Sequence, residues 1–366
     1  MEDTNTTQHK IFIPALDSLR FLFMLVIFFH HYGLYPHGGG FAVSFFFVLS
    51  GFSLTIGYHD RVLQPGFNYF NYITKRLVKF YPLHWMVLFY LAFRLGVHSE
   101  QFWSKFFANF FLVQSFIPDG KYFFSFNSPS WFLCNTVFYS LLFPFLLKCI
   151  CSIKAVSKIT FASLIVALYF ILLIIVPQEY YHAFLYINPI GRLIDFIMGI
   201  FIGLLFLKLV RNGFVEKTET YRVPVAITIL CMIVAFIISV SDVDSSLFLR
   251  RFYWMLWTPF ILIVSIWSFN REIEPSKAYW GGDFLKITNI LRWLGKYSFS
   301  FYIIHSLSIG LFSKILGYLS VDNTTVVVLV TILGTILIAI AVQKLFVDPV
   351  TNFSMKILNR KKYEYN

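Results

Sequence analysis

The strongest constraint on this chain is its series of long apolar stretches. Each is long enough to cross a hydrocarbon core of roughly 30 Å as a helix. Only 13% of the 366 residues are charged, whereas soluble globular proteins carry about a quarter. This deficit excludes a water-soluble enzyme, a disordered chain and a nucleic-acid-binding domain. We therefore predict an all-α, polytopic membrane bundle of about ten transmembrane helices, at residues 12–33, 41–58, 81–98, 130–148, 159–176, 187–207, 223–241, 252–269, 297–316 and 325–347.

The distribution of basic residues predicts how the bundle is oriented. If the N-terminus is cytoplasmic, the segments on that side hold 21 Lys and Arg residues and the opposite segments hold four. Cytoplasmic loops of membrane proteins collect Lys and Arg. The pattern therefore predicts that both termini are cytoplasmic. It also explains most of the net charge of +12 without a polyanionic partner.

Residues 1–366 are expected to form one integral-membrane domain with no attached soluble domain. The aromatic run 102–117 contains Lys105, Asn109 and Gln114, so we predict an interfacial or re-entrant helix there instead of a span. The four cysteines lie in or beside apolar runs without a CxxC pair. We expect them to pack as small apolar side chains, with no metal site.

The first apolar stretch contains several ionisable residues, which are costly inside a membrane. Arg20 and His31 are eleven residues apart, which places them on one helix face about 16 Å apart along the axis. Asp17 precedes Arg20 by three residues and can pair with it. These side chains could line one cavity, with the histidine as a general base. The alternative is that Arg20 reaches the interface and that His30 and His31 mark the outer boundary.

A second group of basic residues follows the second apolar stretch. Arg76 and Lys79 are three residues apart, so they share a helix face at the predicted cytoplasmic entrance. Such a pair could hold phosphate groups. The alternative interpretation is a plain cytoplasmic anchor that follows the charge rule for membrane loops.

Other polar residues in the apolar stretches favour structural roles. Arg192 and Asp195 are three apart and predict an intramembrane ion pair. His305 is a lone histidine, which in isolation is more often structural. Three small residues of the second stretch suit close helix packing: Ser44, Ser50 and Gly51.

With these residues in place, the chain resembles the membrane acyltransferase-3 family. The resemblance covers nearly the whole chain, and its motifs occur in the family's order. They are Asp17-Ser-Leu-Arg20 with His31, Phe46-Phe47-Val-Leu-Ser50-Gly51-Phe52, Arg76-x-x-Lys79-x-x-Pro82, Ser130-Trp131-Phe-Leu-Cys134-Asn135 running on to Pro144, Arg192-x-x-Asp195, Tyr297-Ser298-x-Ser300-x-Tyr302-x-x-His305, and Asp348-Pro349.

The resemblance implies an O-acyltransferase of the bacterial cytoplasmic membrane. Its donor would be acetyl-CoA from the cytosol, and its acceptor a hydroxyl of a cell-surface or lipid-linked glycan, with no metal and no nucleic acid. The resemblance also implies roles by position. The catalytic group would be His31, Arg20 and Asp17, the donor site Arg76, Lys79 and Ser50, and the acceptor site Trp131, Asn135 and His305.

Three positions depart from the family pattern. Lys79 stands where arginine is usual, which keeps the charge but loses the two-pronged contact of a guanidinium. Thr136 stands where many members have glutamate, so the acceptor site is expected to differ. Asp348 replaces a common glutamate, which is a conservative change.

A transporter or exporter of polysaccharide or lipid-linked intermediates is the alternative from another class. Its intramembrane charges would then line a transport path. No inverted repeat is visible in the sequence, which weighs against this alternative. Dependence on a cytosolic acyl donor separates the two interpretations. Within the enzyme interpretation, succinyl transfer is a variant of acetyl transfer, whereas a serine triad is not supported because no G-x-S-x-G motif occurs.

Overall fold

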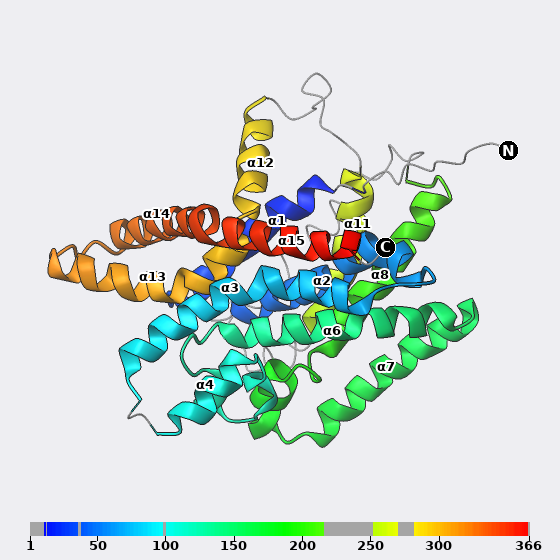
Figure 1. The fold of residues 1–366 in the computed structure, drawn as a ribbon, viewed down its shortest axis with the longest axis horizontal. Coiled ribbons are helices and arrows are strands. Elements are labelled where there is room, and N and C mark those ends of the chain that lie inside the picture. The colour runs from blue at the N-terminus through cyan, green and yellow to red at the C-terminus, as the bar shows by residue number, and fades with distance from the viewer. Residues whose placement is uncertain are drawn as a thin grey trace.

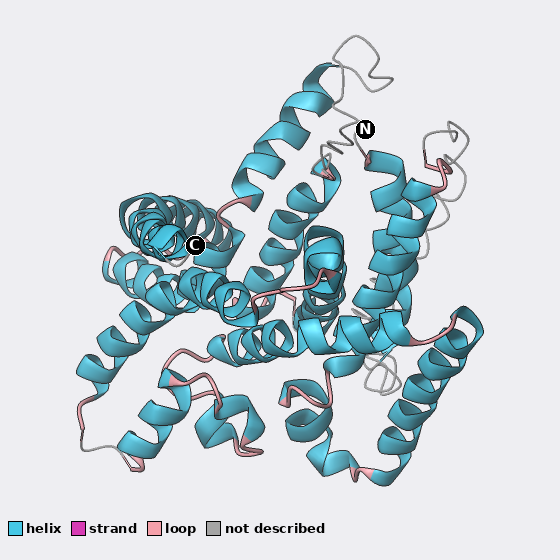
Figure 2. Cartoon of the chain, turned by 45° about the vertical axis from the view of Figure 1, so that its right-hand side comes forward, coloured by secondary structure: helices cyan, strands magenta, loops and turns pink. Residues whose placement is uncertain are grey.

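The computed structural model describes residues 11, 13–35, 38–97, 100–215, 252–269 and 282–364, and this part of the chain is helical without a strand (Figures 1 and 2). The helices in chain order are α1 (Pro14–His31), α2 (Gly38–Leu63), α3 (Tyr69–Leu95), α4 (Phe102–Phe110), η1 (Gln114–Phe116), α5 (Gly120–Phe123), α6 (Ser130–Ser152), α7 (Ala155–Ile175), η2 (Gln178–Tyr180), η3 (His182–Ile187), α8 (Leu193–Arg211), α11 (Tyr253–Ser268), α12 (Gly282–Gly295), α13 (Ser298–Tyr318), α14 (Thr324–Val342), η6 (Gln343–Val347) and α15 (Asp348–Glu364).

Seven helices in the described part of the chain are long and apolar enough to cross a membrane. The described residues confirm the all-helical class, and these helices indicate an integral membrane protein. They are Pro14–His31, Gly39–Leu63, Ser130–Ser152, Ser157–Ile175, Leu193–Arg211, Ser298–Tyr318 and Thr324–Leu358.

The remaining predicted spans have different outcomes. The stretch 252–269 forms α11, an apolar helix of 16 residues. The stretch 81–98 falls largely within α3, whose 27 residues include several charged side chains. The stretch 223–241 lies outside the described residues. The count of ten and the orientation therefore stay predictions.

The aromatic run 102–117 forms two short helices, α4 with nine residues and η1 with three. At 1.5 Å per residue, α4 is only about 13 Å long and cannot cross a bilayer. The prediction that this run is not a span is confirmed. Asn109 is buried there and donates from Nδ2 to the Ser125 hydroxyl at 2.7 Å, which ties α4 to the following loop.

Local sequence sets the ends of several helices. Pro14 opens α1 at a position where its missing N–H costs nothing. The Asn68 side chain accepts a hydrogen bond from the Asn71 N–H at 2.8 Å and caps α3. Gly96 follows that helix with φ of 71°, a conformation that favours glycine.

Helix α2 lies at the centre of the bundle (Figure 1), and its apolar side chains form the core with α1 and α11. Phe45 lies 4.2 Å from Phe23 and 5.1 Å from Trp257, measured between ring centroids. The indole N–H of Trp257 donates to the Phe41 carbonyl at 2.9 Å. Burial of these large rings stabilises the helix that later positions the polar residues.

Helices α2 and α8 pack backbone against backbone through glycines. A Cβ added at Gly51 would lie 2.1 Å from the Phe196 carbonyl oxygen, and one added at Gly199 would lie 2.1 Å from the Val48 carbonyl oxygen. Small residues allow such close approach between membrane helices. The prediction that Gly51 serves close packing is confirmed.

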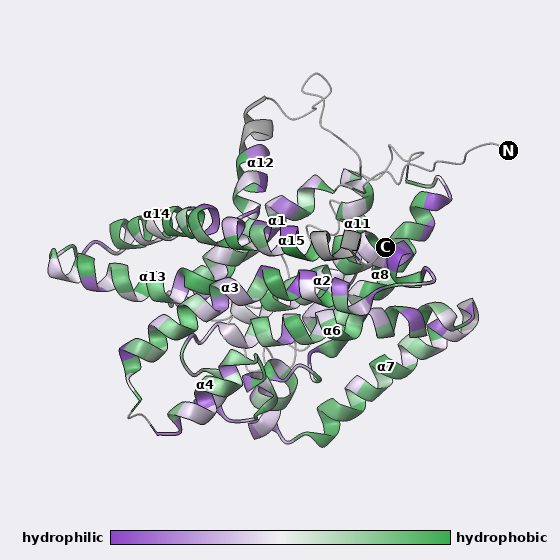
Figure 3. Cartoon of the chain, viewed as in Figure 1, coloured by the Kyte–Doolittle hydropathy of each residue, from purple (hydrophilic) through white to green (hydrophobic). Residues whose placement is uncertain are grey.

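The periphery consists of α7, α13 and α14, whose outward surfaces are mostly apolar (Figure 3). Only 11% of the most apolar 18-residue stretch within Ser157–Ile175 of α7 is buried inside the protein, as expected for a helix that faces lipid. Helix α12 lies across the direction of α13 and α14 (Figure 1), and its last residue, Gly295, packs against the Asp17 carbonyl of α1.

Candidate active site

The polar residues of α1 form a pair as their spacing predicts. Arg20 donates from Nη1 to the Asp17 carboxylate and from Nη2 to the Ser53 hydroxyl of α2 at 3.3 Å. Both charged side chains keep about a third of their surface exposed. Arg20 is therefore held by two neighbouring helices and still accessible.

His31 is the last residue of α1 and is exposed. Its ring centroid lies 4.9 Å from that of His305 on α13 and 5.1 Å from that of His30. His305 is only 1% exposed. The structure thus joins an accessible histidine to a buried one from the other end of the chain.

Helix α2 connects the parts of this site. Gly39 lies against the His30 ring, since a Cβ added there would be 2.5 Å from that ring. Ser53 meets Arg20, and Tyr58 lies five residues further along α2. At 1.5 Å per residue, Gly39 and Tyr58 are about 28 Å apart along the axis. That length is close to the thickness of the hydrocarbon core.

Basic residues surround Tyr58 at the far end of α2. The guanidinium carbons of Arg61 and Arg76 each lie 5.7 Å from the centroid of its ring. Arg76 is half-buried, and its Nε has no hydrogen-bond partner. Lys79, one turn further along α3, is exposed. The two cations therefore occupy different environments, with Arg76 packed into the cluster and Lys79 at its edge.

The residues predicted for the acceptor lie in two places. His305 contacts His31, whereas Trp131 and Asn135 on α6 lie against η3. Trp131 packs on the Tyr186 ring at 5.3 Å, and Asn135 donates from Nδ2 to the Ile187 carbonyl at 3.0 Å. Both are buried, and the Asn135 amide oxygen has no partner.

Segment η3 adds a histidine at this second place. The His182 ring stacks on that of Tyr186 at 5.3 Å. Burial lowers the pKa of His182, so the ring is neutral at neutral pH.

Arg192 and Asp195 form a buried ion pair at the start of α8, as their spacing predicts. Arg192 Nε lies 3.4 Å from Asp195 Oδ2, and both residues are almost fully buried. The Ser44 hydroxyl donates to the Asp195 carboxylate from α2. The Arg192 guanidinium also lies over the ring of Tyr186, 5.2 Å from its centroid. The pair therefore links α2, α8 and η3.

Replacing Asp195 alone by leucine should destabilise the protein strongly. The substitution leaves the Arg192 charge buried without a counter-ion, which costs roughly 3–5 kcal/mol. The double variant Arg192→Met with Asp195→Leu should recover most of the loss, because no charge stays buried. Melting temperatures of the purified protein in detergent measure both effects. A single variant that melts like the wild type would contradict the assignment.

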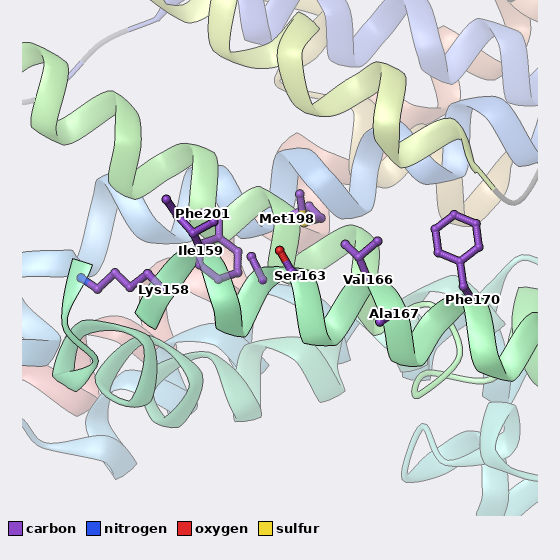
Figure 4. Close-up of a pocket in the computed structure, with 9 residues that line it drawn as sticks. Lys158, Ile159, Ser163, Val166, Ala167, Phe170, Met198 and Phe201 are labelled. Atoms are coloured by element: carbon purple, nitrogen blue, oxygen red, sulfur yellow. The ribbon is translucent and has the colours of Figure 1, made fainter. Parts of the chain in front are cut away.

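A groove of about 600 Å³ lies elsewhere, between α7 and α8 (Figure 4). It is open and mainly apolar, with Lys158 at one end. None of the predicted site residues lines it, so we attribute it to loose packing of α7 in lipid. Within the described ranges, no group of three or more His, Cys, Asp or Glu residues is arranged to hold a metal.

Three residues of this constellation were missed by sequence reasoning. Ser53 lies one turn after Ser50 on α2, and that spacing would have identified it. Arg61 was used only to predict the orientation of the bundle in the membrane. Tyr58 is one of 21 tyrosines, and no motif or spacing distinguishes it from the others. The contacts of Arg61 and Tyr58 depend on how α2 and α3 cross.

Comparison with known proteins identifies the family of the chain. A family model described as an acyltransferase domain matches residues 13–344. Acyltransferase MdmB from Streptomyces mycarofaciens is 37% identical over 114 residues. That alignment covers 29% of this chain and 28% of the relative, so the chain matches less than a third of that protein's length. No solved structure matches the chain. Because the family model spans most of the sequence, the chain belongs to the acyltransferase-3 family of membrane acyltransferases.

Proposed function

We propose that the protein transfers an acetyl group from cytosolic acetyl-CoA to a hydroxyl of a cell-surface or lipid-linked glycan, in the cytoplasmic membrane of a bacterium. The observation that supports the proposal is the order of the basic residues, Arg20 and His31 along the length of α2. A cluster of basic residues lies at one end, Arg20 lies between, and the accessible His31 lies near the other end. This order suits a donor with a phosphate group at one end of a long arm and a reactive carbonyl at the other.

At the reacting end, His31 acts as general base. Its free ring nitrogen takes the proton of the acceptor hydroxyl as that oxygen attacks the thioester carbonyl. The new C–O bond forms, the C–S bond breaks, and His31 returns the proton to the departing thiolate. The products are the O-acetyl ester and the free thiol of coenzyme A.

At the donor end, Arg76 contacts the phosphates of coenzyme A, and Lys79 adds an exposed positive charge. The Arg76 guanidinium is half-buried beside the Tyr58 ring with its Nε enclosed, so the phosphate contact would come from the rest of the guanidinium. Ser50 lies half-buried on α2, one turn before Ser53, the residue that contacts Arg20, and in this proposal it borders the donor arm. The Asp17 carboxylate keeps Arg20 in place beside that path.

The acceptor approaches the opposite end, near His31. The family pattern assigns Trp131 and Asn135 to the acceptor site, but both are buried against η3, so the acceptor can reach them only if that contact opens. Thr136 replaces the glutamate of many relatives and donates to the Phe132 carbonyl at 2.9 Å. This chain therefore recognises its acceptor without a carboxylate at that position.

The test uses membrane vesicles from cells that make the protein and from a deletion strain. Vesicles receive acetyl-CoA labelled in the acetyl group, and mass spectrometry scores surface and lipid-linked glycans for the added mass of one acetyl group. Donor-dependent labelling only with the protein supports the proposal. Glycans that lose export, but not acetylation, in the deletion strain would indicate a transporter instead.

Replacing Arg76 by alanine should weaken donor binding more than it slows the chemistry. Loss of a charged hydrogen bond of about 1.5–3 kcal/mol corresponds to a rise of roughly 10- to 100-fold in KM for acetyl-CoA. The kcat should change much less. Lys208→Ala is the matched control, since Lys208 is exposed near the end of α8. An unchanged KM in Arg76→Ala would refute the donor contact.

A further inference from the structure

His305 has one ring nitrogen without a hydrogen-bond partner, although the residue is only 1% exposed. Its Nδ1 lies 2.6 Å from the Tyr302 carbonyl oxygen, and its Nε2 is the unpartnered atom. Buried polar atoms in native proteins nearly always have a partner. The free Nε2 therefore needs an explanation in terms of a group that engages it.

The contact with Tyr302 fixes the tautomer of a neutral His305. A carbonyl oxygen can only accept a hydrogen bond, so Nδ1 must carry the proton. In the neutral ring, Nε2 then holds a lone pair and can only accept. Two further contacts hold the ring. Phe301 stacks parallel to it, and the Tyr302 ring lies 5.6 Å from it, measured between ring centroids.

The residue that can supply a donor is His31. Its ring centroid lies 4.9 Å from that of His305, with an angle of 50° between the planes. His30 is engaged elsewhere, because its Nδ1 lies 3.2 Å from the Tyr35 carbonyl and its ring packs against Gly39. A small rotation of the exposed His31 brings one of its N–H groups to the lone pair of His305.

We propose that His305 is a positioning residue for His31, in which the lone pair on His305 Nε2 accepts a hydrogen bond from His31 and leaves the other nitrogen of His31 free to act as base. The inference rests on the proposed function of His31. Its physical effect is to select one tautomer of His31 and to accept a stronger hydrogen bond from that same N–H when the ring becomes charged. The Tyr302 carbonyl, His305 and His31 then form a chain that ends at the acceptor hydroxyl.

Two amide substitutions give a matched test. In His305→Gln the amide oxygen can reach the position of Nε2, so it can still accept from His31. In His305→Asn the shorter side chain can bond to the Tyr302 carbonyl but cannot reach His31. His305→Leu removes both contacts. Each variant is purified, its melting temperature is compared with that of the wild type, and kcat and KM are measured with acetyl-CoA and the glycan acceptor.

We expect His305→Asn and His305→Leu to lower kcat roughly 10- to 100-fold, the loss typical when a histidine's supporting partner is removed. KM for both substrates should stay within about twofold of the wild type, since neither contact binds substrate in this scheme. His305→Gln should keep most of the activity. If His305→Leu does not fold, the comparison of the two amides still decides the question.

Three outcomes would overturn this inference. The first is equal kcat in the Gln and Asn variants, which would mean that reach toward His31 is irrelevant. The second is full activity in His305→Leu. The third is a raised acceptor KM with an unchanged kcat, which would place His305 in acceptor binding. Activity that survives in His31→Gln would instead refute the assignment of His31 as the base, on which this inference rests.

Discussion

Replacing His31 by alanine should abolish acetyl transfer and leave the protein folded in the membrane. General-base catalysis by a positioned side chain contributes about 10²- to 10⁴-fold to a rate. His31 lies exposed at the last position of α1 and supports little of the core. Transfer of labelled acetyl to the glycan measures the loss, and the melting temperature in detergent shows that the fold persists.

His31→Gln and His59→Gln sharpen that experiment. Glutamine at position 31 keeps polarity and size but cannot take a proton, so it should be as inactive as alanine. His59 is a histidine at the opposite end of α2, where its ring lies 2.7 Å from the Asp60 carboxylate. Its substitution should leave turnover near the wild-type value. Normal turnover in both position-31 variants would show that the base is another group.

Replacing Gly199 by alanine should destabilise the bundle strongly, although the change adds only one methyl group. The added Cβ would lie 2.1 Å from the Val48 carbonyl oxygen, so α2 and α8 must separate. Overpacking of a core costs about 1–3 kcal/mol even when side chains can adjust, and at Gly199 the obstacle is backbone. We expect a low yield of folded protein and a clearly lowered melting temperature.

Gly57→Ala provides the control for that substitution. Gly57 lies on α2 as well, but a Cβ added there meets nothing within 4 Å. Alanine in a helix is more favourable than glycine by about 1 kcal/mol. The control should therefore melt at or above the wild-type temperature. If both variants behave alike, backbone contact between α2 and α8 does not determine stability.

Hydrophobic length and helical periodicity were enough to predict the helical membrane fold and the pairing of Asp17 with Arg20. Both follow from local rules: about 20 apolar residues span a bilayer, and residues three apart share a helix face. Sequence could not show that Arg20 also meets Ser53, or that His305 lies against His31. Those contacts depend on which helices become neighbours, and the periodicity of one helix carries no such information.

The end of the last predicted span shows a different limit. Proline ends most helices, and the predicted span 325–347 stops before Pro349. In the structure a π-helical turn, Gln343–Val347, carries the chain directly into α15. The Gln343 side chain accepts from the Ser300 hydroxyl at 2.5 Å and donates to the Asp348 carboxylate at 2.7 Å. The wider turn accommodates the proline, and side-chain contacts from α13 stabilise it.

In the proposed function, the spacing of these residues along α2 also limits which molecules can serve as acyl donors. Ser53 and Tyr58 lie about 21 Å and 28 Å along the axis from Gly39. A compact activated acid such as acetyl phosphate has its charged oxygens only three bonds from its reactive carbon, so it cannot contact residues at both ends of α2 at once. A thioester on a long flexible arm can. In the proposed function, the distance between the two ends of α2 therefore sets a minimum length for the acyl donor, in addition to the requirement for negative charge.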